Sequence, residues 1–426
     1  MYLERLAVTD FRSYREADLH LRPGVTVFIG SNGLGKTNLV EALGYVSALS
    51  SHRVSQDGPL IRFGAERAII RASLVRGVQR LSLEVEINAS RANRARINRA
   101  NPVRARDILG LCRSVLFAPE DLALVKGDPG VRRRFLDDLA QALSPRFAGV
   151  RADYERVLKQ RNALLKSARS QGYRRNPGPE FEATLAVWDE HLAEQAARVL
   201  VARLAVVELL RPQVSRAYAA LTDGSKEVQL HYRSSLAGYQ DDESDDGEAV
   251  VEATGQDLSP DVVSVQEWAQ RYREALETAR PRELERGITL VGPHRDELAL
   301  ILGSAPAKGF ASHGETWSFA LSLRLACFYV LRQDQTTDGS DPILILDDVF
   351  AELDASRRAK LAALVAEAEQ VLVTAAVEGD VPSSLRGDRV RVTALGVVEQ
   401  TSADQESMDQ SPVPGTEEVE PDAAEA

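Results

Sequence analysis

Cysteine, methionine and tryptophan are scarce in this chain of 426 residues, with two, two and three copies, and no apolar run is long enough to span a bilayer. The two cysteines, Cys112 and Cys327, are too few for a disulfide framework and fit a reducing compartment. The first residues, Met1–Arg5, lack the apolar core of a signal peptide. We therefore expect a cytoplasmic protein that does not enter a membrane.

Basic residues are outnumbered by acidic ones, 52 to 63, and the formal net charge of −11 argues at first against a nucleic-acid partner. The acidity is concentrated, however. Residues 241–261 contain nine Asp or Glu, residues 401–426 contain eight, and neither segment contains Lys or Arg. The remaining chain therefore carries a net charge of +6. This composition predicts a disordered acidic insert at about 238–261 and a disordered acidic tail at 401–426.

Hydrophobic patterning predicts an α/β chain. Short apolar runs are typical of inner strands of a largely parallel sheet, and alternation is typical of a half-exposed sheet. We expect strands within 2–29 and 69–100 and at 228–232, 288–291, 343–346 and 371–373, and helices after Thr37, through 131–220 and around 268–284.

A polar break at 170–179 divides the helical stretch into two long helices, which are expected to pair as an antiparallel arm. The chain would then form one head from residues 1–130 and 287–400, with a mainly helical second lobe, residues 131–286, inserted in it.

The segment Gly30–Thr37 matches the phosphate-binding pattern G-x-x-x-x-G-K-[ST], with a buried strand before it and a helix after it. The glycines allow a tight loop whose N–H groups point at phosphate oxygens, and the helix adds the positive end of its dipole. Lys36 is expected to reach the β- and γ-phosphates of ATP, and the Thr37 hydroxyl to bind Mg²⁺. The predicted nucleotide-binding residues here are Gly30, Ser31, Asn32, Gly33, Leu34, Gly35, Lys36, Thr37 and Asn38.

The apolar run Ile343–Leu346 ends in two carboxylates, Asp347 and Asp348. In a P-loop fold the first such Asp holds Mg²⁺, usually through water, so Asp347 is predicted to be the second metal residue. Asp348 is then placed to orient or deprotonate the attacking water, and with Lys36 it is the predicted catalytic pair. The structural alternative is a polar strand end that caps the next helix.

Between these motifs, Ser312, Gly314 and Glu315 stand at the start of a predicted helix. Taken alone, such a segment is an ordinary capped helix. The order along the chain changes this interpretation. The order of motifs resembles that of the ABC-type head: a P-loop, then Ser-x-Gly-Glu, an acidic strand and Ala351–Asp354. In such heads the Ser-x-Gly segment of one head touches the γ-phosphate held by another. A single-headed chain would then form a homodimer around two ATP molecules.

Further segments resemble the RecF family of DNA-repair proteins. They extend from the start of the chain to about residue 395, and generic ATPase motifs do not supply them. The segments are Leu6–Tyr14, Gly35–Ala42, Val115–Leu122, Lys126–Gly127, Arg132–Asp137, Leu290–Asp296 and Asp347–Asp354.

The resemblance implies a P-loop ABC-type ATPase head like those of Rad50 and SMC proteins, with a short helical lobe in place of a coiled coil. It implies ATP-dependent dimerisation and DNA binding, slow ATP hydrolysis, and a role in DNA replication, DNA damage repair and the SOS response. The implied partners are DNA at single-strand gaps near duplex junctions, RecR, and indirectly RecO and RecA.

The same resemblance places Arg12 and Ser13 where such heads contact the base or the phosphates. It places Glu120 near a position where a Gln often senses the γ-phosphate, and Thr374 where ABC transporters have a switch His. Leu34, which stands where the family often has Gln, and the acidic insert depart from the family pattern.

Two arginine clusters are candidates for DNA contacts, one within residues 91–106 and one at 132–134. Guanidinium groups suit phosphates, and the lack of interleaved aromatic residues favours backbone recognition without sequence preference. The predicted DNA-binding residues are Arg94, Arg96, Arg99, Arg132 and Arg133. A solvated basic face is the alternative for each cluster, and His294 and Arg295 are expected to be structural.

Two other functions remain open from the sequence. An ABC transporter ATPase would need a surface that couples to membrane helices, and it usually has a His where this chain has Thr374. An SMC-like structural clamp would bind ATP without useful turnover, which Asp348 disfavours.

Overall fold

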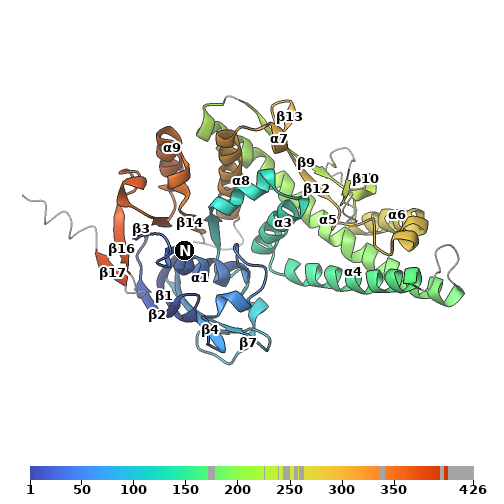
Figure 1. Ribbon diagram of the computed structural model, residues 1–426, viewed down its shortest axis with the longest axis horizontal. Coiled ribbons are helices and arrows are strands. Elements are labelled where there is room, and N and C mark those ends of the chain that lie inside the picture. Colours follow the sequence, from blue (N-terminus) through green and yellow to red (C-terminus); the bar gives the residue numbers. More distant parts are fainter. Residues whose placement is uncertain are drawn as a thin grey trace, which may run out of the picture.

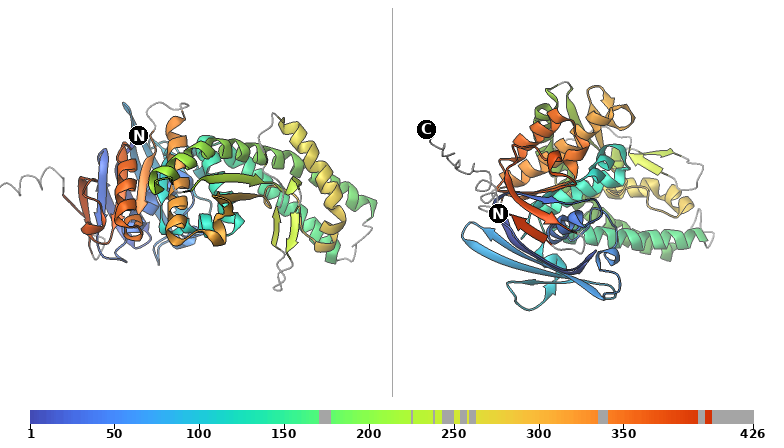
Figure 2. Two further views of the ribbon diagram at one scale, coloured as in Figure 1. Left: turned by 90° about the horizontal axis from the view of Figure 1, so that it is seen from above. Right: turned by 60° about the vertical axis from the view of Figure 1, so that its left-hand side comes forward.

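The computed structural model describes residues 1–170, 178–224, 226–237, 239–242, 250–253, 258, 263–334, 341–393 and 398–401. The molecule is elongated, with a head that contains two large sheets and a helical arm that extends to one side (Figures 1 and 2). No described helix has both the length and the apolar surface needed to cross a membrane.

The first sheet of the head is antiparallel and has the strand order β2-β1-β4-β5-β6-β7. Its strands are β1 (Tyr2–Phe11), β2 (Tyr14–His20), β4 (Arg67–Arg76), β5 (Gln79–Asn88), β6 (Arg94–Ile97) and β7 (Val103–Arg104). Along β5, Leu83, Val85 and Ile87 are buried, and the residues between them are charged. This alternation places one face of the sheet on the core and the other in solvent.

The second sheet has the order β17-β16-β3-β15-β14-β8, and all its neighbouring strands are parallel except β17 with β16. Its strands are β3 (Gly24–Ile29), β8 (Ser114–Phe117), β14 (Ile343–Asp347), β15 (Gln370–Ala375), β16 (Gly387–Val392) and β17 (Val398–Thr401). The apolar runs at 343–346 and 371–373 are buried inner strands, which confirms the predicted largely parallel sheet.

Helix α1 (Lys36–Ala48) lies between the two sheets. Its Leu39 and Leu43 share one apolar core with Val85 of the antiparallel sheet and with Ile343 and Ile345 of the parallel sheet. The opposite face of the parallel sheet, with Leu344 and Leu346, packs in another core with α8 (His313–Gln333) and α9 (Ala355–Val365). The side chains of β14 thus alternate between two cores, as expected for a central strand.

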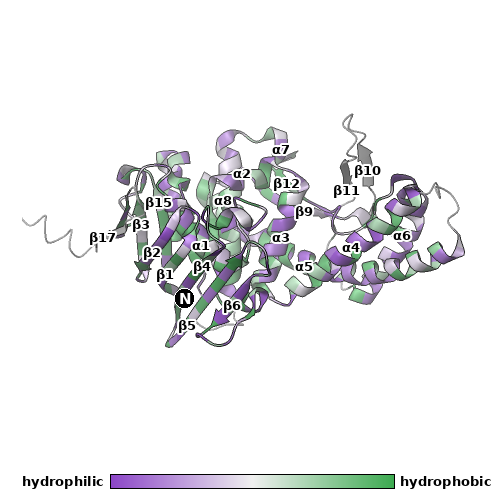
Figure 3. Cartoon of the chain, turned by 60° about the horizontal axis from the view of Figure 1, so that its bottom comes forward, coloured by the Kyte–Doolittle hydropathy of each residue, from purple (hydrophilic) through white to green (hydrophobic). Residues whose placement is uncertain are grey.

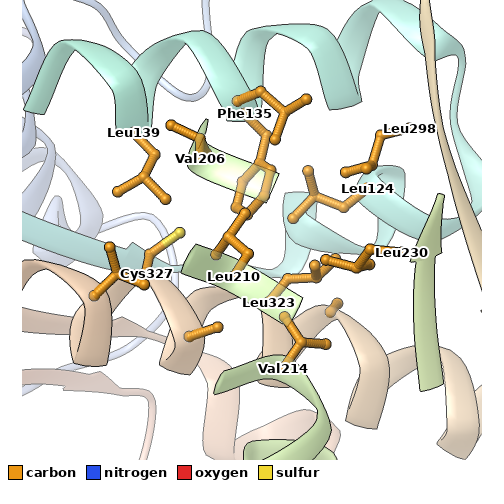
Figure 4. Close-up of a cluster of buried hydrophobic side chains, with 14 of the residues drawn as sticks. Leu124, Phe135, Leu139, Val206, Leu210, Val214, Leu230, Leu298, Leu323 and Cys327 are labelled. Atoms are coloured by element: carbon orange, nitrogen blue, oxygen red, sulfur yellow. The ribbon is translucent and has the colours of Figure 1, made fainter. Parts of the chain in front are cut away.

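The arm contains the predicted pair of long helices, α4 (Phe147–Ser170) and α5 (Pro179–Thr222), together with α6 (Val265–Arg286). Shorter elements join it to the head: α2 (Leu122–Lys126), α3 (Pro129–Leu143), α7 (Ala307–Phe310), and a sheet of β9 (Val228–Arg233), β12 (Glu297–Leu302) and β13 (Ala305–Pro306). Figure 4 shows Phe135 of α3, Leu210 of α5 and Leu323 of α8 in one cluster, so the arm and the head share a continuous core.

Two expectations need correction. Residues 288–291 are not a strand, because side chains bind their backbone. The N–H of Thr289 donates to Asn162 and that of Leu290 donates to Glu283. Within the insert expected to be disordered, the strands β10 (Tyr239–Asp242) and β11 (Val250–Ala253) form an antiparallel pair. The rest of the insert, except residue 258, and the tail from 402 lie outside the described residues.

The segment Gly292–Asp296 is a structural joint at the base of the arm. The buried carboxylate of Asp296 accepts hydrogen bonds from the Tyr232 hydroxyl (2.7 Å) and the Ser235 N–H (2.8 Å). The Nδ1 of His294 lies 2.6 Å from the Tyr154 hydroxyl, and burial lowers the pKa of this imidazole to about 3. The uncharged ring and the satisfied carboxylate support the structural role expected for this segment.

Arg132 also belongs to this joint, in place of the DNA contact predicted for it. Arg132 is 6% exposed, and its guanidinium makes two 2.7 Å hydrogen bonds to the carboxylate of Glu297. It donates further to the carbonyls of Leu124 and Gly127. A guanidinium with these buried partners has no free face for a phosphate. Arg133 is half-buried and donates to the carbonyl of Asp296.

We expect Arg132→Ala to destabilise the protein by about 3–5 kcal/mol, because it leaves the Glu297 carboxylate buried without its cation. Urea unfolding measures this difference. Arg134→Ala, at an exposed position of α3, is the matched control and should change stability by less than about 0.5 kcal/mol. Arg132→Met combined with Glu297→Leu should restore most of the loss. An Arg132→Ala protein that unfolds like the wild type but binds DNA less tightly would restore the original prediction.

Candidate nucleotide-binding site

The candidate site lies where three neighbouring parallel strands end. The P-loop follows β3, Asp347 ends β14, and β15 runs between them. In this register Thr374 of β15 is opposite Asp347 on one side and Phe28 of β3 on the other. Since parallel strands end at the same edge of the sheet, the two predicted motifs meet there although more than 300 residues separate them.

Two glycines of the P-loop have no room for a side chain. A Cβ on Gly30 would lie 2.4 Å from the carbonyl oxygen of Val392. Gly35 has φ +101°, and a Cβ there would lie 2.9 Å from the ring of Tyr14. Gly35 precedes α1, whose first turn has no acidic residue and no side-chain cap. The positive end of α1 is therefore left for an anion.

Lys36 is almost completely buried, and its ammonium group lies within the loop. Its Nζ donates to the carbonyl of Gly30 at 2.7 Å, and it approaches the Ser31 carbonyl (3.3 Å) and the Asn32 side chain (3.4 Å). The ammonium thus lies inside the ring of backbone that would surround a phosphate. A triphosphate in the loop would replace these neutral carbonyl acceptors with negatively charged oxygens.

Asp347 is held by two hydroxyl groups. Its Oδ1 accepts a hydrogen bond from Thr37 at 3.0 Å and one from Thr374 at 2.6 Å. The Thr374 hydroxyl also accepts from the N–H of Asp348 at 2.9 Å. Thr374 therefore fixes both acidic residues at the end of β14. The sequence analysis named Thr374 only as a departure from the transporter pattern, and this positioning role was missed.

Burial raises the pKa of Asp347 to about 6; the hydrogen bonds from Thr374 and Thr37 oppose this rise, and the charges of Asp348 and Glu120 add to it. A buried carboxylate beside a hydroxyl fits a divalent cation, whose charge would replace the lost hydration. The described residues contain no cluster of three His, Cys, Asp or Glu, so Thr37 and Asp347 would share Mg²⁺ with phosphate oxygens.

Asp348 adopts a left-handed backbone conformation with φ +51° and begins a short 3₁₀ turn, Val349–Glu352. Its carboxylate is half-exposed and has no hydrogen-bond partner among the described residues. A carboxylate left open beside the metal residue suits the predicted role of orienting a water.

Three residues predicted for the site lie beside the loop: Arg12, Ser13 and Asn38. Their contacts are linked through Glu41 and Arg53. Arg12 makes a bidentate ion pair with the fully buried Glu41, with distances of 2.8 and 2.5 Å. Asn38 donates to the Ser13 hydroxyl at 2.9 Å and accepts from Arg53 at 3.0 Å. The Arg12 guanidinium thus anchors α1 in this structure, while Ser13 and Asn38 remain at the loop. Arg53 is a neighbour that the sequence analysis did not find.

Ser312, Gly314 and Glu315 form the predicted capped helix start. Ser312 is the N-cap of α8, its hydroxyl accepts from the N–H of Glu315, and the Glu315 carboxylate accepts from the N–H of Ser312. Lys226 lies 2.6 Å from Glu315 and, with these caps, lowers the pKa of Glu315 to about 2. A Cβ on Gly314 would lie 2.8 Å from the Arg357 guanidinium.

No hydrogen bond or ion pair within the described part of the chain connects residues 312–315 to the P-loop, 30–37. The Ser312 side of the predicted site is therefore open in a single chain, and Ser312 itself is exposed. Arg94, Arg96 and Arg99 lie elsewhere, on β6 and its turn at the edge of the antiparallel sheet.

The raised pKa of Asp347 predicts a pH-dependent stability. An unfolded Asp ionises near pH 4, whereas Asp347 in the folded protein ionises near pH 6. Between these values the folded state keeps a proton that the unfolded state releases, so stability falls as the pH rises from about 4 to about 6. Without nucleotide and Mg²⁺, Asp347→Asn should be more stable than the wild type by about 2–3 kcal/mol at pH 7.5, and by no more than about 1 kcal/mol at pH 4.5. Urea unfolding at both pH values tests this, and a pH-independent difference would contradict it.

A family model described as the RecF/RecN/SMC N terminal domain matches residues 2–395. The chain is 69% identical to the DNA replication and repair protein RecF of Renibacterium salmoninarum, over 94% of this chain and 100% of the relative. It is 53% identical to the RecF protein of Streptomyces avermitilis, over the same shares.

Two solved structures support the fold. One is "Structure of the recombination mediator protein RecF-ATPrS in RecFOR pathway", with a TM-score of 0.79 and 25% identity over 94% of this chain and 98% of that chain. An Smc head domain from Pyrococcus furiosus is 16% identical over 96% of this chain and 98% of that chain, and its TM-score of 0.51 shows a shared fold. The α/β head with its helical lobe is thus the RecF and SMC type of ATPase head. The chain belongs to the RecF family of DNA replication and repair proteins.

Proposed function

We propose that this protein binds and slowly hydrolyses ATP, pairs with a second copy of itself around two ATP molecules, and in that state binds DNA. The observation that carries the proposal is the meeting of Lys36, Thr37 and Asp347 at one sheet edge, with Thr37 and Asp347 3.0 Å apart. A similar solved RecF structure is named for an ATP analogue, which supports ATP as the nucleotide.

Within this site each residue has a separate task. The P-loop N–H groups and Lys36 would hold the phosphates, and Thr37 and Asp347 would hold Mg²⁺, which supplies charge neutralisation at the phosphates when bound. Thr374 keeps Asp347 in place, and the free carboxylate of Asp348 would orient the attacking water. No described residue of the segment 312–315 contacts the P-loop of the same chain, which fits slow hydrolysis until a second chain closes the site.

The open Ser312 segment supports pairing between copies. Gly314 lies in the first turn of α8, at the positive end of the helix dipole, and no described contact joins Ser312 or Gly314 to the P-loop of the same chain. Phe310, two residues before Ser312, is 72% exposed and would add apolar surface to a contact between copies. A γ-phosphate held by another copy would complete the environment of this segment.

The cellular role follows from the family. RecF relatives are named as DNA replication and repair proteins, and one solved RecF is described as a recombination mediator in the RecFOR pathway. We propose the same role for this chain: a cytoplasmic protein of the SOS response that binds DNA at single-strand gaps and duplex junctions, and acts with RecR and RecO to load RecA.

The alternatives are less well supported. A transporter subunit is disfavoured because Thr374 binds Asp347 where a switch His would be, and because the arm replaces a surface for membrane helices. An SMC-like clamp without useful turnover remains the second candidate, since an Smc head has the same fold. A turnover assay with and without duplex DNA separates the two, because a clamp of this kind would show no stimulation.

Light scattering of the pure protein with and without ATP, repeated with gapped DNA, tests the proposal directly. We expect a monomer without ATP and a dimer with ATP and Mg²⁺, and we expect the dimer to bind the gapped DNA. Absence of nucleotide binding in calorimetry with Mg²⁺ would overturn the proposal.

Lys36→Met should abolish ATP-dependent dimerisation, because the loop loses the cation that faces the β- and γ-phosphates. Light scattering at saturating ATP measures the result. Lys159→Met, at an exposed position of α4, removes the same charge far from the loop and should dimerise normally. Dimers of normal strength in the Lys36→Met protein would refute this assignment.

Ser312→Arg should leave ATP binding intact but block dimer closure, because a large side chain would stand where the γ-phosphate of the second copy is expected. Ser312→Ala controls for the lost N-cap, which costs about 1 kcal/mol. Ser304→Arg, at an exposed turn between β12 and β13, controls for the added charge. Calorimetry reports binding and light scattering reports pairing. A Ser312→Arg protein that still pairs fully would rule out the contact between copies.

A further inference from the structure

The solvent face of the antiparallel sheet has charges that alternate from strand to strand. In one cross-strand row, Arg71 of β4 lies opposite Glu84 of β5, and Glu84 lies opposite Arg96 of β6. The ion pairs are formed, with distances of 2.7 Å from Arg71 and 3.1 Å from Arg96 to Glu84. The acidic residue of this row, Glu84, is therefore already neutralised by flanking arginines.

The next row ends in two like charges. Glu86 of β5 lies opposite Arg94 of β6, and Arg94 lies opposite Arg104 of β7. Glu86 forms its ion pairs with Arg91 (2.7 Å) and Arg67 (3.5 Å). Neither Arg94 nor Arg104 has an ion pair in the described part of the chain, and both are exposed. Like charges directly opposite each other destabilise a sheet, and no ion pair among the described residues offsets the repulsion between Arg94 and Arg104.

A hollow of about 190 Å³ lies on this face of the sheet. Its lining is almost entirely charged and consists of Arg67, Glu84, Glu86, Arg91, Arg94, Ala95, Arg96 and Pro102. With Arg71 and Arg104 beside it, six arginines surround two glutamates, which gives a net charge of +4. Figure 3 shows β5 and β6 at the lower edge of the head, where much of the ribbon is hydrophilic.

Arg99 extends this charge at the turn that follows β6. The turn is closed by a hydrogen bond from the Ala100 N–H to the Ile97 carbonyl at 3.0 Å, and its central residues, Asn98 and Arg99, have φ values of +51° and +61°. Such a two-residue turn prefers Asn followed by Gly. Asn98 fits this preference, but a long side chain at the second position is strained. The backbone conformation at Arg99 would suit glycine better, and the exposed Arg99 side chain adds to the positive charge of Arg94 and Arg96 on β6.

We propose that Arg94, Arg104 and Arg99, together with the hollow beside them, form a binding site for the phosphodiester backbone of duplex nucleic acid, separate from the ATP site. The inference rests on the DNA binding proposed above and assigns where the duplex lies. Arg96, predicted from the sequence as a DNA contact, is paired with Glu84 and lines the hollow.

The chemistry of the site selects a backbone rather than bases. Guanidinium groups bind phosphate oxygens in bidentate fashion, and no aromatic residue lines the hollow. Arg94 and Arg96 are two residues apart on one strand, about 6.6–6.8 Å, and Arg104 adds a contact on the neighbouring strand. Cations on the last two strands of the sheet, β6 and β7, match a row of phosphates, and binding would not depend on base sequence.

Fluorescence anisotropy with a labelled duplex, in the presence of ATP and at several salt concentrations, tests the site. Arg94→Gln combined with Arg104→Gln should weaken duplex binding at least tenfold and reduce the slope of log K against log salt by about 1.8, about 0.9 per lost phosphate contact. Arg94→Lys combined with Arg104→Lys should retain most of the slope. ATP hydrolysis without DNA and ATP-dependent dimerisation should match the wild type in both variants.

The same sheet offers a matched control. Arg5 of β1 and Arg80 of β5 are exposed on the same solvent face, outside the hollow, and are paired with Asp18 and Glu4. Arg5→Gln combined with Arg80→Gln removes the same charge and should leave the slope unchanged. Arg99→Gly should raise the Tm, because it relieves the strained turn, and should reduce the slope by about 0.9.

The outcomes separate this site from the proposed function. If the wild type binds duplex and the variant with both Arg94 and Arg104 replaced has the same slope and affinity, the location proposed for the site is wrong. The proposal that the protein binds DNA is then unaffected. If the ATP-bound wild type binds no duplex, DNA binding fails and the site fails with it. Inorganic tripolyphosphate at the same phosphate concentration should not displace the duplex. Displacement would assign the site to free polyphosphate and overturn the backbone assignment.

Discussion

The parallel ladder of β3, β15 and β14 is the constraint on which the rest of the site depends. It brings the end of the P-loop strand and the end of the acidic strand to one edge, with Thr374 between them. The Thr374 hydroxyl donates to Asp347 and accepts from the N–H of Asp348, so one side chain orients both acids. Because Asp347 is buried, its negative charge is poorly solvated without a cation. The site therefore suits a state in which a cation is bound.

Much of the head could be predicted from the sequence because the patterns that predict it are local. The P-loop, the buried strands and the capped start of α8 each depend on a few consecutive residues, and the structure has them where expected. Contacts between residues that are distant in sequence could not be predicted. Arg132 looks like Arg134 in the sequence, yet it faces Glu297, 165 residues away. Residues 288–291 look like a strand, but Asn162 and Glu283 bind their N–H groups from other helices. Thr374 has a role only once Asp347 is its neighbour.

Buried charge is concentrated where the arm meets the head and inside the arm. Arg132 faces Glu297, Arg203 faces Asp137 with 2.7 and 2.9 Å hydrogen bonds, and Arg161 is shared between Asp189 and Glu283. Apolar residues of similar size would often give equal or greater stability at such positions. Directional ion pairs add a geometric requirement that apolar packing lacks. We regard them as the features that fix the angle between the helices of the arm and the head.

The 44-residue helix α5 reaches from the tip of the arm to α8, the helix that begins at Ser312. At 1.5 Å per residue it is about 66 Å long. It packs on α8 at one end and on α4 and α6 toward the other, so a change in the tilt of α8 would be transmitted along α5 to the helices of the arm (Figure 1). A 5° tilt at the head end would sweep the far end through about 6 Å, given this length. In the dimer proposed above, where Ser312 meets a γ-phosphate, this length would turn a small adjustment of α8 into a displacement of several ångströms at the tip of the arm.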